Sequence, residues 1–142
     1  MAQQSDLSPP RSNPVLPDLG HAALSRYFET MNAGAYEHTA ALFTADGEMR
    51  APFEAPVKQP DIAAYLKKEA RSMILHPRRA EPLTGYPAED PLSEYDVKVA
   101  GAVRTPLFSV NVAWLFALQD DAIRVVRIKL LASPQELLHL RR

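Results

Sequence analysis

The sequence predicts one α+β domain in which helices pack against a curved antiparallel sheet. Apolar residues recur at helical spacing in the first half of the chain and alternate at strand spacing in the second half. Helices followed by a run of strands is the order typical of α+β domains. The length of 142 residues, with 46% apolar and 23% charged residues, is that of a single globular domain with a substantial core.

The first 17 residues are predicted to form a flexible, proline-rich tail, which leaves residues 18–142 as the folded domain. Four of the 13 prolines lie in this stretch, which has few aliphatic side chains to bury. It lacks the basic start and continuous apolar run of a secretory signal. No other segment is long and apolar enough to cross a membrane. We therefore expect a cytoplasmic protein.

Three helices are predicted in the first half. Asp18 is expected to N-cap the first, which ends near residues 32–34 and carries Tyr27 on its apolar stripe. A short second helix is expected at residues 35–43, followed by a turn at 45–47 and a strand at 48–51. Residues 52–60 are too rich in proline for regular structure. Pro60 then opens a third helix, whose predicted common face comprises Ile62, Tyr65, Leu66, Glu69 and Met73.

The second half is predicted to form a sheet. Four prolines between residues 76 and 91 indicate a loop, or at most a strand with broken pairing. Residues 94–104, 107–118 and 122–131 alternate or are rich in β-branched side chains, which predicts an antiparallel meander with its last turn at 119–121. The sequence SPQE at 133–136 satisfies a capping box and predicts a short terminal helix.

Composition excludes several functional classes. Lys and Arg total 16 against 17 for Asp and Glu, so the chain has no basic field with which to bind nucleic acid. The lack of cysteine removes disulfides, thiolate metal sites and cysteine nucleophiles. The chain contains no hydrolase elbow, zinc-protease motif or phosphate loop. We therefore expect neither a catalytic site nor a metal site.

Several segments resemble the C-terminal domain of the cyanobacterial orange carotenoid protein. They are YFETMN at 27–32, ALF at 41–43, APFEAP at 51–56, KKE at 67–69, TPLF at 105–108, NVAW at 111–114 and LLASPQELL at 130–138. The resemblance covers most of residues 19–142, and its most specific part is the closing motif. It implies a nuclear-transport-factor-2-like fold, a cone in which helices pack inside the sheet.

The resemblance also implies a function, that of a soluble ketocarotenoid carrier with a photoprotective or antioxidant role. Such a protein takes up a pigment such as canthaxanthin or echinenone and delivers it to helical carotenoid proteins. Tyr27 and Trp114 are implied as the donors to the ketone oxygen, since each combines an apolar ring with one N–H or O–H. The expected walls of the binding tunnel are Leu107, Phe108, Val110, Val112, Phe116, Val126 and Ile128.

Without the resemblance, Tyr27 and Trp114 are typical core residues, and so are the wall residues. Two positions depart from the family. Leu107 replaces the tryptophan of the Thr-Pro-Trp-Phe motif, which removes an aromatic wall. Ala70 stands where many relatives carry cysteine, so thiol control of a dimer is unavailable to this chain. Glu69 resembles a glutamate that bridges to the helical domain in the family.

The implied partners follow from the length of the ligand. A polyene longer than the radius of gyration of this domain, about 14–15 Å, cannot be enclosed by one copy. We expect a homodimer that shares one carotenoid, exchange of one subunit for a helical carotenoid protein, and transient membrane contact for uptake. By resemblance, the terminal helix at 133–142 gates the site. The alternatives are an isomerase or dehydratase of the same fold, with His38 or Asp96 as the acid–base residue, and a non-catalytic dimerisation module.

Overall fold

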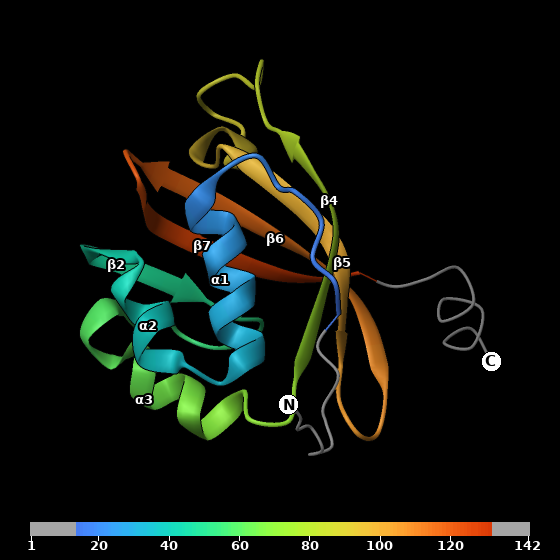
Figure 1. Ribbon diagram of the computed structural model, residues 1–142. Coiled ribbons are helices and arrows are strands. Elements are labelled where there is room, and N and C mark those ends of the chain that lie inside the picture. The colour runs from blue at the N-terminus through green and yellow to red at the C-terminus, as the bar shows by residue number, and fades with distance from the viewer. Residues whose placement is uncertain (1–13, 132–142) are drawn as a thin grey trace.

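The computed structural model describes residues 14–131, which form a curved sheet with helices packed on its concave face (Figure 1). This arrangement confirms the predicted α+β class. In chain order the elements are α1 (Ala22–Ala33), α2 (Tyr36–Ala41), β2 (Phe43–Arg50), β3 (Val57–Lys58), α3 (Gln59–Glu69), β4 (Ile74–Pro82), the 3-10 helix η1 (Pro91–Glu94), β5 (Val97–Arg104), β6 (Ser109–Gln119) and β7 (Ala122–Leu131).

The six strands of the described region form one mixed sheet in the order β3-β2-β7-β6-β5-β4. The predicted antiparallel meander is confirmed, because β5 pairs with β6 and β6 with β7 in antiparallel register. Strand β2 pairs with β7 in parallel, which the sequence pattern did not predict. The fully antiparallel sheet expected from the sequence is therefore wrong at this one junction.

Helix α1 begins later than predicted. Its N-cap is His21, whose Nδ1 accepts a hydrogen bond from the Ala23 N–H at 3.1 Å. The predicted cap, Asp18, instead accepts from the Gly20 N–H at 2.9 Å and so shapes the turn before the helix. Gly34, with φ at 71°, ends the helix in the left-handed conformation that favours glycine. The predicted end at residues 32–34 is confirmed.

The segment after α1 departs from the prediction in two ways. Helix α2 ends at Ala41, and Phe43 is the first residue of β2. The turn predicted at 45–47 lies inside β2, where the pairing with β7 is interrupted. Phe43 pairs with Ile123, and the next paired residue of β2, Glu48, pairs with Val125, so the register shifts between them. Gly47 fits there because a Cβ at this position would lie 3.0 Å from the Thr44 carbonyl oxygen.

Strand β4 shows how prolines enter a sheet. Residues 74–82 pair with β5 along their whole length, with a break in register between Pro77 and Arg79. The second of the two predicted alternatives, a strand with broken pairing, is therefore correct for this part. Because β4 is an edge strand, a proline can direct its missing N–H away from the ladder. The proline-rich segment before α3 is irregular as predicted, except for the two residues of β3.

The core lies between the concave face of the sheet and the inner faces of α1 and α3. Leu16, which the prediction placed in the tail, is partly buried against this core. Residues 1–13 of the predicted tail and the terminal helix predicted at 133–142 lie outside the described residues. None of the helices between residues 14 and 131 has the length and apolarity needed to span a membrane.

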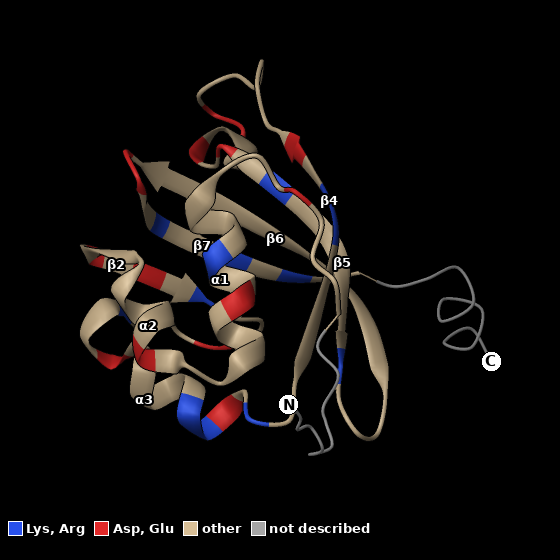
Figure 2. Cartoon of the chain, viewed as in Figure 1, with Lys and Arg blue, Asp and Glu red and all other residues tan. Residues whose placement is uncertain are grey.

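Charged residues of both signs are spread over the helices and most strands, whereas β6, at the centre of the meander, carries none (Figure 2). Because β6 is buried along most of its length, this apolar strand forms the floor of the concave face. The functional residues expected at Val110, Val112, Trp114 and Phe116 all lie on it.

Candidate functional site

A cavity of about 110 Å³ lies between α1, α3 and the concave face of the sheet. Residues from both helices and from five strands meet there because the strands curve around the helices. Its lining is almost entirely apolar. The residues are Tyr27, Met31, Met49, Ala51, Pro52, Tyr65, Leu66, Glu69, Ala70, Met73, Leu75, Val103, Trp114 and Ile128.

Tyr27 and Trp114 reach this cavity from opposite layers of the fold. Tyr27 comes from α1, and Trp114 comes from β6, where it pairs with Val99 on one side and Ile128 on the other. Edge-to-face contacts fix both rings: the centroids of Trp114 and Phe28 are 4.8 Å apart, and those of Tyr27 and Phe116 are 5.3 Å apart. The two residues that the resemblance paired therefore line one cavity and are held rigidly.

The polar atoms of this pair make no hydrogen bond in the described region. Within residues 14–131, neither the Tyr27 hydroxyl nor Trp114 Nε1 has a hydrogen-bond partner, although both residues are almost fully buried and line the cavity. Burial, and then the nearby Tyr65 phenol, raise the pKa of Tyr27 well above its ordinary value. Tyr27 is therefore a neutral donor at physiological pH. A carbonyl oxygen has two lone pairs and can accept from both residues.

A second phenol closes one side of the cavity. The Tyr65 hydroxyl donates to Glu54 Oε1 at 2.9 Å, which joins α3 to the loop at 51–56. Partial burial, and then the hydrogen bond to Glu54, raise the pKa of Tyr65. Tyr65 is thus protonated and already paired, whereas Tyr27 is protonated and unpaired.

The expected wall residues fall into three groups. Ile128 lines the cavity. Val112, Phe116 and Val126 are buried in the core, and Val110 is half-buried against it. Leu107 and Phe108 lie at the turn between β5 and β6, where their exposed fractions are 89% and 57%. The structure therefore brings Tyr27, Trp114 and Ile128 together and leaves the two turn residues outside the cavity.

Most of the cavity wall was not identified as such from the sequence. Met31 lies one helical turn after Tyr27, and Tyr65, Leu66 and Glu69 lie on the face of α3 that the apolar spacing predicted. The prediction also placed Met73 on this helix, but α3 ends at Glu69, and Met73 lines the cavity from the segment that follows. These positions carried a signal for burial but none for a cavity. Three methionines contribute to the wall, and their flexible thioethers let a cavity adapt its shape to a ligand. The others missed are Met49, Leu75 and Val103.

Ala70 caps the C-terminus of α3 and is buried beside the cavity. Its carbonyl oxygen accepts a hydrogen bond from the Tyr36 hydroxyl at 3.1 Å, which anchors the end of α3 to α2. The position that departs from the family is therefore part of the cavity wall. Neighbouring Glu69 also lines the cavity, although the residue as a whole is exposed.

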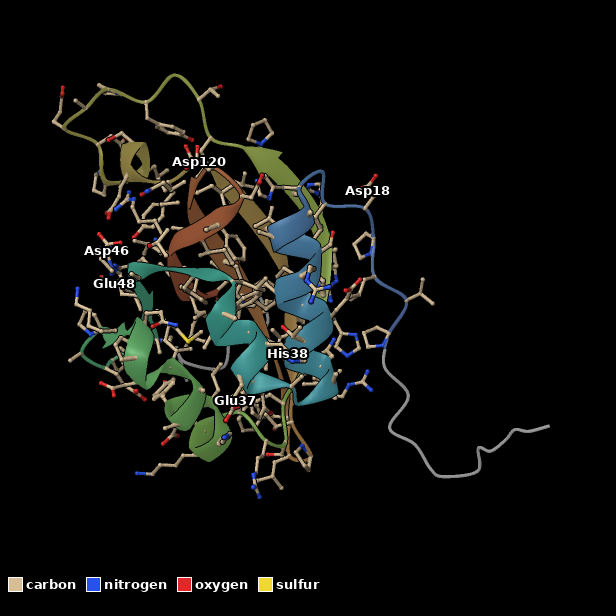
Figure 3. All side chains as sticks on the ribbon, turned by 60° about the vertical axis from the view of Figure 1, so that its left-hand side comes forward. Asp18, Glu37, His38, Asp46, Glu48 and Asp120 are labelled. Atoms are coloured by element: carbon tan, nitrogen blue, oxygen red, sulfur yellow. The ribbon has the colours of Figure 1, made fainter. Side chains whose placement is uncertain are left out.

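The acid–base candidates lie elsewhere. His38 is exposed on α2, beside Glu37 (Figure 3). Asp96 is exposed, and its Oδ2 accepts from the Leu118 N–H at 2.7 Å. Neither residue lines the cavity. Across residues 14–131 no group of His, Asp and Glu side chains is arranged to hold a metal ion.

Comparisons with known proteins identify the fold and a relative. No protein-family model matches the chain. The orange carotenoid-binding protein of Synechocystis is 35% identical over 128 residues, which cover 86% of this chain and 39% of the relative. The solved orange carotenoid protein of Anabaena (Nostoc), which binds canthaxanthin, matches with a TM-score of 0.71 and 33% identity, covering 91% of this chain and 42% of that one. A nuclear-transport-factor-2-like protein of Cytophaga hutchinsonii has a TM-score of 0.60 at 9% identity, over 82% of this chain and 91% of that one.

The chain spans about two fifths of the length of the curated relatives it matches. The match to the Cytophaga protein concerns the fold alone, whereas the identity to the carotenoid proteins extends over most of the chain. The chain therefore has a nuclear-transport-factor-2-like fold and is homologous to orange carotenoid protein over the C-terminal domain region of that protein.

Proposed function

We propose that this chain binds a ketocarotenoid, with the keto ring in the cavity and the ketone oxygen accepting hydrogen bonds from Tyr27 and Trp114. The observation that carries the proposal is a pair of donors that have no hydrogen-bond partner within residues 14–131 and that line an almost entirely apolar cavity. The homologous protein of Anabaena binds canthaxanthin, which gives the ligand class.

The donors make the site selective for a ketone. A donor left unpaired in an apolar site costs about 1–3 kcal/mol, and a ketone relieves that cost where a hydrocarbon ring does not. Hydrogen bonds to the ketone also polarise the conjugated chain, so the bound pigment absorbs at longer wavelength than the free pigment. Canthaxanthin and echinenone both carry such a ketone.

The proposed activity is carriage rather than catalysis. An isomerase or dehydratase needs a carboxylate or histidine placed to move a proton. His38 and Asp96 do not line the cavity, and Glu69 is open to solvent. We propose a cytoplasmic carrier that collects pigment by transient membrane contact and delivers it to a helical carotenoid protein, with a photoprotective role.

The size of the cavity supports a shared ligand. A volume of about 110 Å³ is far below the 300 Å³ or more of pockets that enclose drug-sized ligands. One copy therefore holds one end of the pigment, and a homodimer or a helical partner covers the rest.

The first test is colour. The chain is expressed in a host that makes ketocarotenoids, purified, and examined by absorption spectroscopy and light scattering. We expect a coloured, red-shifted dimer, whereas a well-folded colourless protein would refute pigment binding. Tyr27→Phe and Trp114→Phe should each reduce the red shift. Tyr86→Phe, in the exposed loop after β4, is the matched control and should leave the spectrum unchanged.

The second test is transfer. The pigmented protein is mixed with a helical carotenoid protein lacking pigment, and the spectrum and size of each species are followed. Pigment that moves to the helical protein supports delivery, and pigment that stays bound through many hours of mixing contradicts it. A Leu107→Trp variant, which restores the aromatic residue of the family motif, tests whether the departure at this position alters the rate.

A further inference from the structure

We infer that the ligand leaves the cavity between Pro52 and Ile128 and continues into a neighbouring cleft, whose floor is formed by the end of β7. This inference rests on the proposed function and assigns the surface of this chain that the ligand meets as it leaves the cavity, before a partner covers the remainder. The cleft has a volume of about 790 Å³ and is lined by Glu48, Arg50, Ala51, Pro52, Phe53, Glu54, Pro56, Arg127, Ile128, Lys129 and Leu130.

The cavity and the cleft adjoin each other. Ala51, Pro52 and Ile128 line both. At these three residues the cavity and the cleft are separated only by the residues themselves and not by a further helix or strand. A ligand whose ring is held by Tyr27 and Trp114 would therefore enter the cleft by passing between Pro52 and Ile128.

The cleft exists because β2 ends before β7 does. The parallel pairing of the two strands reaches Arg50 and Arg127, after which the chain leaves the sheet at Ala51. Strand β7 continues to Leu131, paired only with β6 in the described region. The loop at 51–56 therefore faces an uncovered corner of the sheet.

The floor of the cleft is a continuation of the cavity wall. Trp114 pairs with Ile128, and Val112 pairs with Leu130, so the side chains of Ile128 and Leu130 lie on the concave face with that of Trp114. Ile128 is half-buried and Leu130 is 50% exposed. The apolar stripe thus runs outward from the tryptophan to a leucine that no described residue covers fully.

The loop at 51–56, which also lines the cleft, carries another uncovered apolar side chain. Phe53 is 97% exposed, and its φ of 65° lies in the left-handed region that residues other than glycine rarely adopt. The hydrogen bond from Tyr65 to Glu54 ties down the next residue of the loop. An elongated apolar ligand in contact with Phe53 and Leu130 would bury both side chains. The charged residues Arg127 and Lys129, which alternate with Ile128 and Leu130 along β7, point to the other face of the sheet.

The alternative path runs over the turn between β5 and β6, where the resemblance implied a wall at Leu107 and Phe108. These two residues line neither the cavity nor the cleft. A ligand in the cleft contacts Leu130, whereas a ligand over the turn contacts Leu107. Substitution of each leucine therefore distinguishes the two paths.

The experiment measures two ligands on the same variants. Canthaxanthin probes cavity and cleft together, and isophorone, a single trimethylcyclohexenone ring, probes the cavity alone. Fluorescence of Trp114, the only tryptophan of the chain, reports binding of both. Leu130→Glu should weaken canthaxanthin binding roughly tenfold and change isophorone binding by less than about twofold, because the charge meets only the longer ligand. Leu131→Glu is the matched control: Leu131 follows on the same strand, points to the other face, and does not line the cleft.

Phe53→Gly is the second variant, and its fold is secure because the backbone there suits glycine. We expect a loss of canthaxanthin affinity of about threefold, from the loss of one apolar contact. The inference is overturned if both cleft variants bind canthaxanthin as the wild type does, or if Leu107→Glu alone weakens it. Light scattering of Leu130→Glu shows whether this substitution dissociates a dimer. If Leu130→Glu loses canthaxanthin affinity only when the dimer dissociates, and Phe53→Gly keeps the affinity of the wild type, the inference is also overturned. Failure of the wild type to bind either ligand refutes the proposed function instead.

Discussion

The side-chain amide of Asn32 exchanges two hydrogen bonds with the backbone of Leu75. Its Nδ2 donates to the carbonyl oxygen at 2.9 Å, and its Oδ1 accepts from the N–H at 2.8 Å. Both residues are buried. The amide thereby fastens the last turn of α1 to the start of β4, and it fixes Tyr27 and Leu75 on opposite sides of the cavity.

Asn32→Ala should lower the free energy of unfolding by about 2–4 kcal/mol, because it leaves two buried backbone groups of Leu75 without partners. Urea denaturation measures the change. Asn111→Ala is the control, since Asn111 is half-buried on β6 and its side chain makes no hydrogen bond within residues 14–131. Equal effects of the two substitutions would show that the exchange with Leu75 does not stabilise the fold.

Tyr27→Phe should leave the free energy of unfolding of the ligand-free protein within about 0.5 kcal/mol, because the hydroxyl has no partner in the described region to lose. Affinity for canthaxanthin should fall roughly tenfold, the effect of removing a hydrogen bond worth about 1–1.5 kcal/mol. Denaturation and fluorescence titration measure the two quantities. Marked destabilisation of the ligand-free protein would instead assign the hydroxyl a structural role.

Gly101→Ala should destabilise the protein by about 3 kcal/mol or more, at the upper end of overpacking effects. A Cβ at this position would clash with the carbonyl oxygen of His76 and would lie 2.9 Å from Cζ3 of Trp114. Because the tryptophan must move, its fluorescence spectrum and its affinity for isophorone should change together. Ala100→Ser, at the adjacent position facing the other side of the sheet, should change neither.

Stability should fall as the pH drops below 6.5, in part because of His76. Its Nε2 is buried without a hydrogen-bond partner among the described residues, and burial together with Arg104 and Arg78 lowers the pKa of the imidazole below its ordinary 6.5. The unfolded chain therefore takes up a proton that the folded chain resists, and acidification favours unfolding. His76→Leu should reduce the difference in urea midpoint between pH 7.5 and pH 5.5. His38→Leu, at an exposed position, is the control. If the difference in urea midpoint between the two pH values is the same in His76→Leu as in the wild type, His76 is not a cause of the pH dependence.

Alternation of side chains was sufficient to predict β5 and β6, and the β-branched residues of 122–131 were sufficient to predict β7. It was not sufficient for β4, where Pro77 and Pro82 argue against a strand unless that strand is known to lie at an edge. Position in the sheet is a property of the whole fold, and the local sequence does not carry it. The parallel pairing of β2 with β7 escaped prediction for the same reason.

The candidate site was predicted in part. Resemblance singled out Tyr27 and Trp114, and the structure places both at one cavity. It also singled out Leu107 and Phe108, which the structure leaves exposed at a turn. Apolar periodicity does not distinguish Val112, which packs against protein, from Ile128, which lines a cavity, since both are β-branched residues on the same face of the sheet. The difference depends on how far the helices stand from the sheet.

The parallel pairing of β2 with β7 also constrains the order in which the parts of the sheet can pair during folding. Phe43 and Ile123 are neighbours in the sheet but lie 80 residues apart in the chain (123 − 43 = 80). The two halves of the sheet can therefore join only after residues up to Arg127 have been synthesised, and such long-range pairings slow folding. Until then Ile128, which borders both cavity and cleft, is not in place. The cavity and the cleft therefore form late in folding, after the two halves of the sheet have paired.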